Sequence, residues 1–227
     1  MHFHTRLVKD GVNQFSTGEG LTEDALKVIG GYLSHEASLT AFGNTVPTSF
    51  LRLVPHQEAP TSICWGDRNR SVLVRVPLGW QHIDDSMFRD ANPNESPITG
   101  LPNDSQTVEL RSPDGSAAIH LLLAGIVVAA RLGLTQPGMA DYARERKVDG
   151  DASQTPGLDQ LPSSCFEAAG RLLAQREDYE AYGVFPAGLI DSWASRLVEL
   201  GDMHLRDDLA DSRVSVEELV DRYFHVG

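Results

Sequence analysis

A short stretch of the chain, residues 52–75, concentrates side chains that could bind anions. Besides Glu58 it holds four arginines, which are Arg52, Arg68, Arg70 and Arg75. An arginine guanidinium matches the oxygens of a carboxylate or a phosphate with paired hydrogen bonds. Pro55 and Pro60 flank Glu58, which predicts a constrained loop there. On charge alone, a solvated strand edge held by ion pairs is the favoured interpretation.

Two segments with alternating polarity are predicted to be strands that carry more of these groups. Residues 71–77 alternate like a half-buried strand, and one of its faces carries Ser71, Leu73 and Arg75. Residues 105–111 alternate again, and one face of that strand carries Thr107, Glu109 and Arg111. A carboxylate and an arginine on one face could also form a plain ion pair.

A pair of histidines, His2 and His4, lies at the start of the sequence. Two residues apart on a strand, they would project from the same face and could share a metal ion or a phosphate. A pair at a chain end is also often a frayed surface segment. By itself this pattern favours the second interpretation.

Composition excludes several classes of function. The 227 residues carry a formal net charge of −13, which argues against nucleic acid or an anionic membrane as the main partner. The longest apolar run, residues 117–130, is broken by His120 and Gly125 and is too short to span a bilayer. Two cysteines make no metal-binding spacing, and no signal peptide is recognisable. A reducing cytoplasm is the expected location.

The elements that must position these groups are mostly helical. Thr22 is predicted to cap a helix that runs to about Ser38, and residues 117–132 predict a buried helix ending before Gly133. Three further helices are expected near the C-terminus, over residues 164–176, 187–200 and 215–224. The segments predicted to be loops are 40–49, 136–160 and an irregular excursion at about 78–104. The predicted class is α+β, with mostly antiparallel strands carrying the site and helices on their other face.

The order of these residue types resembles a known family. R-L-V-P-x-x-E-A-P from Arg52, followed by R-N-R-S-x-x-x-R-x-P from Arg68, resembles the glutamate-binding and flap region of glutamine synthetases. Met1-His-Phe-His4 matches the end of the family's G-x-G-M-H-x-H strand, and Glu109 and Arg111 match its E-x-R strand. L-P-x-S-x-x-E-A, Y-G-V-F and V-x-x-x-E-L-x-x-Y-F are similar to its C-terminal part. The resemblance covers nearly the whole chain except the excursion at 78–104.

The resemblance implies a role for each candidate residue. His2 and Glu109 are implied to bind a divalent metal, and the groups implied to meet the ATP phosphates are His4, Arg70 and Arg75. Arg52 and Arg111 are implied to hold the glutamate carboxylates. Glu58 is implied to be the flap residue that closes over the ammonium site, and Arg70 is also expected to contribute to substrate binding and catalysis.

The implied activity is an ATP-dependent ligase that joins glutamate and ammonia through γ-glutamyl phosphate, with Mg²⁺ or Mn²⁺. Residues 1–227 are expected to be the C-terminal portion of such a catalytic domain, without the N-terminal domain and the upstream metal-binding strands. On that basis the chain alone is expected to be inactive, and a homo-oligomer is expected only if the upstream domain is present. Two alternatives stay open: a non-catalytic glutamine synthetase-like binding or remnant protein, and a γ-glutamyl ligase for another amine.

Overall fold

The computed structural model describes most of the chain. The described ranges are residues 1–17, 20–53, 59–79, 86–95 and 105–226, and only the backbone is described at Met87 and Phe88. Glu58 therefore lies outside the described residues, together with most of the loop predicted around it.

The central element is a sheet with the strand order β1-β6-β5-β4. Its strands are β1 (Phe3–Thr5), β6 (Val108–Leu110), β5 (Val74–Val76) and β4 (Trp65–Asp67). β1 and β5 both pair with β6 in antiparallel orientation, and β4 pairs with β5 in parallel. A separate antiparallel hairpin joins β2 (Val8–Lys9) to β3 (Val12–Asn13). The expected α+β fold with mostly antiparallel strands is confirmed.

The register of the sheet separates a polar face from a buried one. In one row His4, Glu109, Arg75 and Gly66 are successive partners across the four strands. The neighbouring row has apolar side chains, all buried except the partly buried Phe3, and consists of Phe3, Leu110, Val74 and Trp65. Because side chains alternate along a strand, the two rows project to opposite faces.

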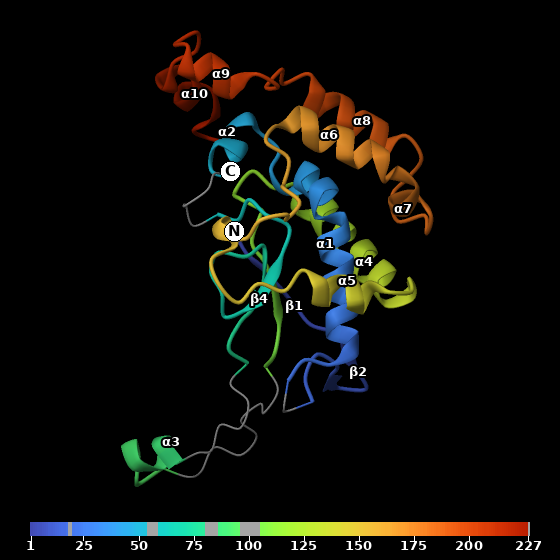
Figure 1. The fold of residues 1–227 in the computed structure, drawn as a ribbon, viewed down its shortest axis with the longest axis vertical. Coiled ribbons are helices and arrows are strands. Elements are labelled where there is room, and N and C mark those ends of the chain that lie inside the picture. The colour runs from blue at the N-terminus through green and yellow to red at the C-terminus, as the bar shows by residue number, and fades with distance from the viewer. Residues whose placement is uncertain (18–19, 54–58, 80–85, 96–104, 227) are drawn as a thin grey trace.

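Two long helices form the hydrophobic core next to the sheet. They are α1 (Glu23–Gly43) and α4 (Ile119–Thr135), which lie side by side in Figure 1. Thr22 caps α1 by accepting a hydrogen bond from the Ala25 amide, as predicted. The Tyr32 hydroxyl of α1 lies 2.9 Å from the Thr5 hydroxyl and so joins the helix to β1.

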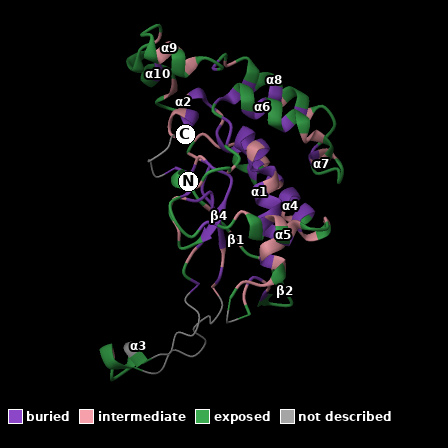
Figure 2. Cartoon of the chain, viewed as in Figure 1, coloured by how far each residue is buried: buried purple, intermediate pink, exposed green. Residues whose placement is uncertain are grey.

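Shorter helices extend this core. Pro47–Leu51 forms α2, and the C-terminal half adds α5 (Met139–Glu145), α6 (Cys165–Ala174), α7 (Arg176–Glu180), α8 (Leu189–Val198), α9 (Leu205–Ala210) and α10 (Val216–Tyr223). Ser164 and Ser215 cap α6 and α10, as the sequence predicts. Aromatic rings of Phe42, Tyr179, Phe185 and Trp193 pack together and connect α1 to α7 and α8. Figure 2 shows burial concentrated where α1, α4 and the sheet meet.

Several predicted boundaries were wrong, and packing explains them. α1 continues to Gly43 instead of ending near Ser38, because Leu39 and Phe42 are buried in the core. Gly133 lies inside α4 and does not end it. A glycine stands there because a Cβ would lie 2.2 Å from the Lys27 carbonyl oxygen of α1. This glycine is needed for the close crossing of α1 and α4.

Other segments predicted to be irregular contain helices. Residues 136–160 hold α5 and a short 3₁₀ helix, Ala152–Gln154, instead of a continuous loop. The excursion at 78–104 contains α3 (Ser86–Ala91), which Figure 1 shows lying apart from the sheet and the other helices. The strand predicted over 71–77 is limited to Val74–Val76, so Leu73 turns into the core and does not share a face with Arg75.

Among the described helices, no single one is long and apolar enough to cross a membrane. α4 and α5 together satisfy the length and composition, but they are bent by 104° where they meet.

Candidate functional site

The candidate site is built around one buried carboxylate. Glu109, in the middle of β6, has a side chain that is 0% exposed. Arg75 Nε donates a hydrogen bond to Glu109 Oε2 at 2.5 Å, and His2 Nδ1 lies 2.6 Å from Glu109 Oε1. The Nε atom of Arg111 lies 4.0 Å from the same Oε1 atom. Residues from three separate segments therefore converge on one side chain.

His4 faces this cluster from the neighbouring strand. Its Nδ1 lies 3.1 Å from the Thr107 hydroxyl, and its Nε2 lies 3.7 Å from Glu109 Oε1. The side chain of His4 is about half exposed. The two histidines thus lie on the same side of β1, as their spacing predicts.

The electrostatics of the cluster favour a neutral His2. Burial lowers the pKa of its imidazole, Glu109 acts in the opposite direction, and the positive charges of Arg111, the N-terminus and Arg75 lower it further. A neutral imidazole offers a lone pair, which is the form that binds metal ions or accepts protons.

Part of this cluster has the donor atoms of a cation site. Glu109 Oε1 is buried and has no hydrogen-bond donor among the described residues, although the imidazole of His2 is close to it. Carboxylate oxygens and imidazole nitrogens are common metal ligands, but Mg²⁺ and Mn²⁺ need about six ligands, mostly oxygen atoms or water. Within the described ranges, no group of three or more His, Cys, Asp or Glu residues could hold a metal ion. His2 and Glu109 therefore fit one side of a larger site.

Arg111 is buried behind Glu109 and contacts the backbone of the segment before β5. Its guanidinium donates to the carbonyl oxygens of Arg70 and Val72, the latter at 3.0 Å. Arg111 therefore holds the backbone of the segment before β5, in which Arg70 has an exposed side chain. Of the arginines expected to meet phosphates, Arg75 lies in the cluster, whereas Arg70 is connected to it through its backbone carbonyl and has an exposed side chain.

Arg52 reaches the same region from the end of α2. Its guanidinium donates to the Ser112 carbonyl oxygen, directly after Arg111 in the chain. The Nε atom of Arg52 is buried without a hydrogen-bond partner among the described residues. Burial lowers the pKa of Arg52, and the carboxylate of Asp114 acts against that effect. The two arginines expected to hold an amino acid are thus joined through Ser112.

Sequence reasoning missed a residue that orders the arginine-rich turn. The amide nitrogen of Asn69 donates to the carbonyl oxygens of Val148 and Gly150, at 3.1 and 2.6 Å. Its side-chain oxygen accepts from the Ser71 amide at 2.9 Å. An asparagine two positions before a serine is a signal for such an Asx turn. Asn69 fixes the backbone on both sides of Arg70.

Sequence reasoning also missed a buried acid beside the site. Glu36, on the core side of α1, is fully buried and accepts a hydrogen bond from the Ser112 hydroxyl through Oε1. Its Oε2 atom has no partner among the described residues. Burial raises the pKa of this carboxyl to about 8, and the Ser112 hydrogen bond opposes the shift. The sequence signal was an acidic residue within a helix whose neighbours, such as Leu33, are apolar.

Known proteins resemble this chain in sequence. The family described as glutamine synthetase, catalytic domain, matches residues 1–203. The glutamine synthetase of Pyrococcus abyssi is 34% identical over 233 residues, an alignment that covers 100% of this chain and 47% of that protein. The glutamine synthetase of Vibrio cholerae is 32% identical over 196 residues, covering 85% of this chain and 37% of that protein.

Solved structures resemble it in fold. The ADP complex of GmaS has a TM-score of 0.64 at 25% identity and covers 97% of this chain and 44% of that one. The glutamine synthetase of Plasmodium falciparum, solved by cryo-electron microscopy, has a TM-score of 0.63 at 17% identity and shows likeness of fold alone. The chain thus spans less than half the length of these proteins.

Proposed function

This chain belongs to the glutamine synthetase family, within its catalytic domain, and from that premise we propose that it contributes to an ATP-dependent ligase acting on glutamate and ammonia. The resemblance inferred from the motifs is confirmed by the family match. The observation that carries the proposed activity is the cluster of His2, Arg75 and Arg111 around the buried Glu109. A site that activates a carboxylate with ATP needs cationic groups beside a metal-binding carboxylate.

In the proposed site, His2 and Glu109 hold one side of a divalent cation, Mg²⁺ or Mn²⁺. Bound there, the ion would neutralise charge on the phosphate oxygens. The half-exposed His4, whose Nε2 faces the cluster, and Arg75 would contact the same phosphates. The exposed side chain of Arg70 is proposed to contact them as well. ATP binding by this chain is also supported by the ADP complex of the structurally similar GmaS.

Glutamate would be held by the two arginines that meet at Ser112. Arg52 presents a buried Nε atom that has no acceptor among the described residues, and a substrate carboxylate oxygen could accept its proton. Arg111 would place its charge beside the same position while it fixes the Arg70 segment. Glu58 is proposed to take the proton of the attacking ammonium ion, as the resemblance implies.

The remaining parts of the proposal concern the whole protein. The chain is proposed to be the C-terminal portion of a catalytic domain, to act in the cytoplasm and to assemble as a homo-oligomer together with the rest of that domain. The excursion at 78–104, which carries α3, is proposed to be an insertion.

Calorimetry with the purified chain tests the proposed function. Mg-ATP and L-glutamate should each bind with one site, and the affinity for Mg-ATP should fall when Mg²⁺ is withdrawn. His2→Ala should remove most of that Mg²⁺ dependence, whereas His120→Ala, a substitution at an exposed position of α4, should not. A chain that binds neither ligand would favour a remnant protein, and a chain whose glutamate binding is strengthened by methylamine and not by ammonium would favour a ligase for another amine.

A further inference from the structure

The helix α9, in the C-terminal part of the chain, carries an arginine that contacts the end of α2. One guanidinium nitrogen of Arg206 donates to the carbonyl oxygens of Phe50 and Leu53, at 2.8 and 3.0 Å. Arg206 lies beyond residues 1–203, the part of the chain that the family match covers. Figure 1 shows α9 and α10 beside α2, far from them in sequence.

The two carbonyl groups lie at the end of α2 and just beyond it. The Phe50 carbonyl oxygen already accepts a hydrogen bond from the Leu53 amide at 3.2 Å, and Arg206 adds a charged donor to it and to the Leu53 carbonyl oxygen, which lies beyond the last helical residue, Leu51. A cationic side chain at a helix C-terminus supplies charge-assisted hydrogen bonds to them. Because the two acceptors flank Arg52, Arg206 fixes the backbone from which the Arg52 side chain extends.

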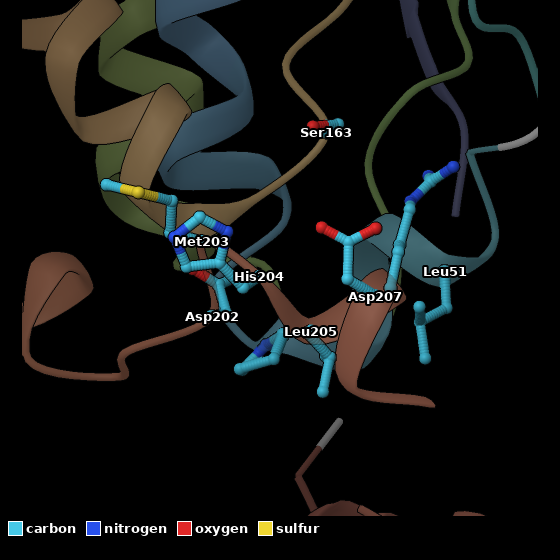
Figure 3. Close-up of a pocket in the computed structure, with 9 residues that line it drawn as sticks. Leu51, Ser163, Asp202, Met203, His204, Leu205 and Asp207 are labelled. Atoms are coloured by element: carbon cyan, nitrogen blue, oxygen red, sulfur yellow. The ribbon is translucent and has the colours of Figure 1, made fainter. Parts of the chain in front are cut away.

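The turn that precedes α9 is held to the helical body by hydrogen bonds. Just before α9, the buried carboxylate of Asp202 accepts hydrogen bonds from the amides of Cys165 and Phe166, at 2.7 and 3.1 Å. Figure 3 shows Asp202, Asp207 and Leu51 around a pocket of about 210 Å³ that separates this turn from α2. The support of α2 therefore runs from α6 through Asp202 to Arg206.

At its other end, Arg52 reaches the site through the Ser112 carbonyl oxygen. Its Nε atom is buried and has no hydrogen-bond partner among the described residues. A change in the direction of the α2 terminus would move this nitrogen relative to Ser112. An error of about 1 Å in such a position is enough to weaken binding of a substrate carboxylate strongly.

We propose that Arg206 is a positioning residue that sets the placement of Arg52 for binding the amino-acid substrate. The proposal rests on the proposed function, in which Arg52 binds glutamate. It assigns a role in substrate binding to a helix that the family match does not include.

The test is a set of binding measurements on the full chain, with L-glutamate and Mg-ADP titrated separately. Arg206→Gln should raise the Kd for glutamate about tenfold, as expected when charge-assisted hydrogen bonds are lost, and change the Kd for Mg-ADP by less than about twofold. Arg206→Lys, which keeps the charge, should recover part of the glutamate affinity. Arg213→Gln is the matched control, because Arg213 pairs with Asp208 and Asp211 and, among the described residues, forms no ion pair with α2.

A double-substitution cycle separates positioning from plain stability. If Arg206 acts through Arg52, Arg206→Gln should have no more than about a twofold further effect on glutamate in the Arg52→Lys background. Equal losses of glutamate and Mg-ADP affinity, or additive effects in the cycle, would overturn the inference while leaving the proposed function in place. A parent chain that binds Mg-ADP but no glutamate would overturn both.

Discussion

Arg75 Nε and Glu109 Oε2 form a 2.5 Å hydrogen bond between side chains that are direct partners across β5 and β6. The register of β5 and β6 places the two side chains opposite each other. Because Glu109 is buried, its carboxylate needs hydrogen bonds or an opposite charge, and Arg75 supplies both. The pair occupies only one of the two oxygens. The other oxygen faces His2, so the same residue can be held by the sheet and still offer a ligand atom.

Glu109→Gln should destabilise the chain by about 3 kcal/mol, the scale for breaking a buried ion pair. The substitution keeps the shape of the side chain but leaves the charges of Arg75 and the buried Arg111 without their partner. Urea denaturation at pH 7 measures the change. Glu199→Gln on the exposed C-terminal side of α8 is the control, and its effect should stay within about 0.5 kcal/mol. An equally small effect of Glu109→Gln would show that the pair contributes nothing to folding.

Glu36 should make stability depend on pH in a defined window. Its pKa is raised from 4.5 to about 8 in the folded chain, so the folded state binds a proton that the unfolded state releases. The stabilisation is fully present below about pH 4.5 and is lost as pH rises through 8. Between pH 5 and pH 8, the parent should lose on the order of 3 kcal/mol relative to Glu36→Gln.

The measurement is the difference in unfolding free energy between parent and Glu36→Gln at several pH values. The glutamine can still accept the Ser112 hydrogen bond and stays neutral, so the variant should be the more stable protein at pH 8. Taking the difference removes the titration of all other groups. A difference that does not vary with pH would mean that Glu36 is ionised in the folded chain.

The starts of several helices could be predicted, because helix capping depends on local sequence. Thr22, Ser164 and Ser215 were identified as helix caps from residue type alone, and each accepts the expected backbone hydrogen bond. The ends of α1 and α4 could not be predicted, because they depend on tertiary packing: burial of Leu39 and Phe42 accompanies the extension of α1 to Gly43, and Gly133 lies inside α4, where it packs closely against α1.

For the site, alternation along β6 predicted which side chains share a face with Glu109. It could not predict that Arg75 lies opposite Glu109, because strand pairing joins residues 34 positions apart. Nor could it show that Arg111 contacts carbonyl oxygens or that Arg206 supports α2, since both contacts depend on tertiary structure. The roles of the arginines toward ligands remain predictions.

Gly31→Ala should destabilise the chain by about 2 kcal/mol or more, the scale of overpacking a core. A Cβ at this position would stand 2.1 Å from the Ala129 carbonyl oxygen, a backbone atom that cannot move without shifting α4. Gly170→Ala in α6 is the matched control, since its Cβ would meet nothing within 4 Å. That control should gain up to about 1 kcal/mol from helix propensity. Thermal denaturation of both variants checks the pair, and an unchanged Tm for Gly31→Ala would contradict the close crossing.

The purified chain of 227 residues should make no glutamine from glutamate, ammonia and ATP with Mg²⁺ or Mn²⁺. His2 and Glu109 are the two proposed cation ligands, and the described residues contain no group of three or more His, Cys, Asp or Glu that could hold the ion. A divalent ion with so few protein ligands is too poorly fixed to support phosphoryl transfer. Glutamine detected by chromatography, absent with Glu109→Gln, would refute this expectation.

Arg52→Lys should weaken glutamate binding by at least about tenfold and change Mg-ATP binding by less than about twofold. Lysine keeps the charge but cannot copy the planar fork of a guanidinium. In Arg52 this group donates to the Ser112 carbonyl oxygen, and its buried Nε atom has no acceptor in the part of the chain that the structure describes. Arg70→Lys provides the opposite contrast, because the exposed Arg70 is expected to meet phosphates, and it should weaken Mg-ATP more than glutamate. Calorimetric titration of each ligand into both variants gives four ratios of Kd between variant and parent chain. If Arg52→Lys leaves the Kd for glutamate unchanged, Arg52 serves only to hold Ser112, and the amino-acid site must lie elsewhere.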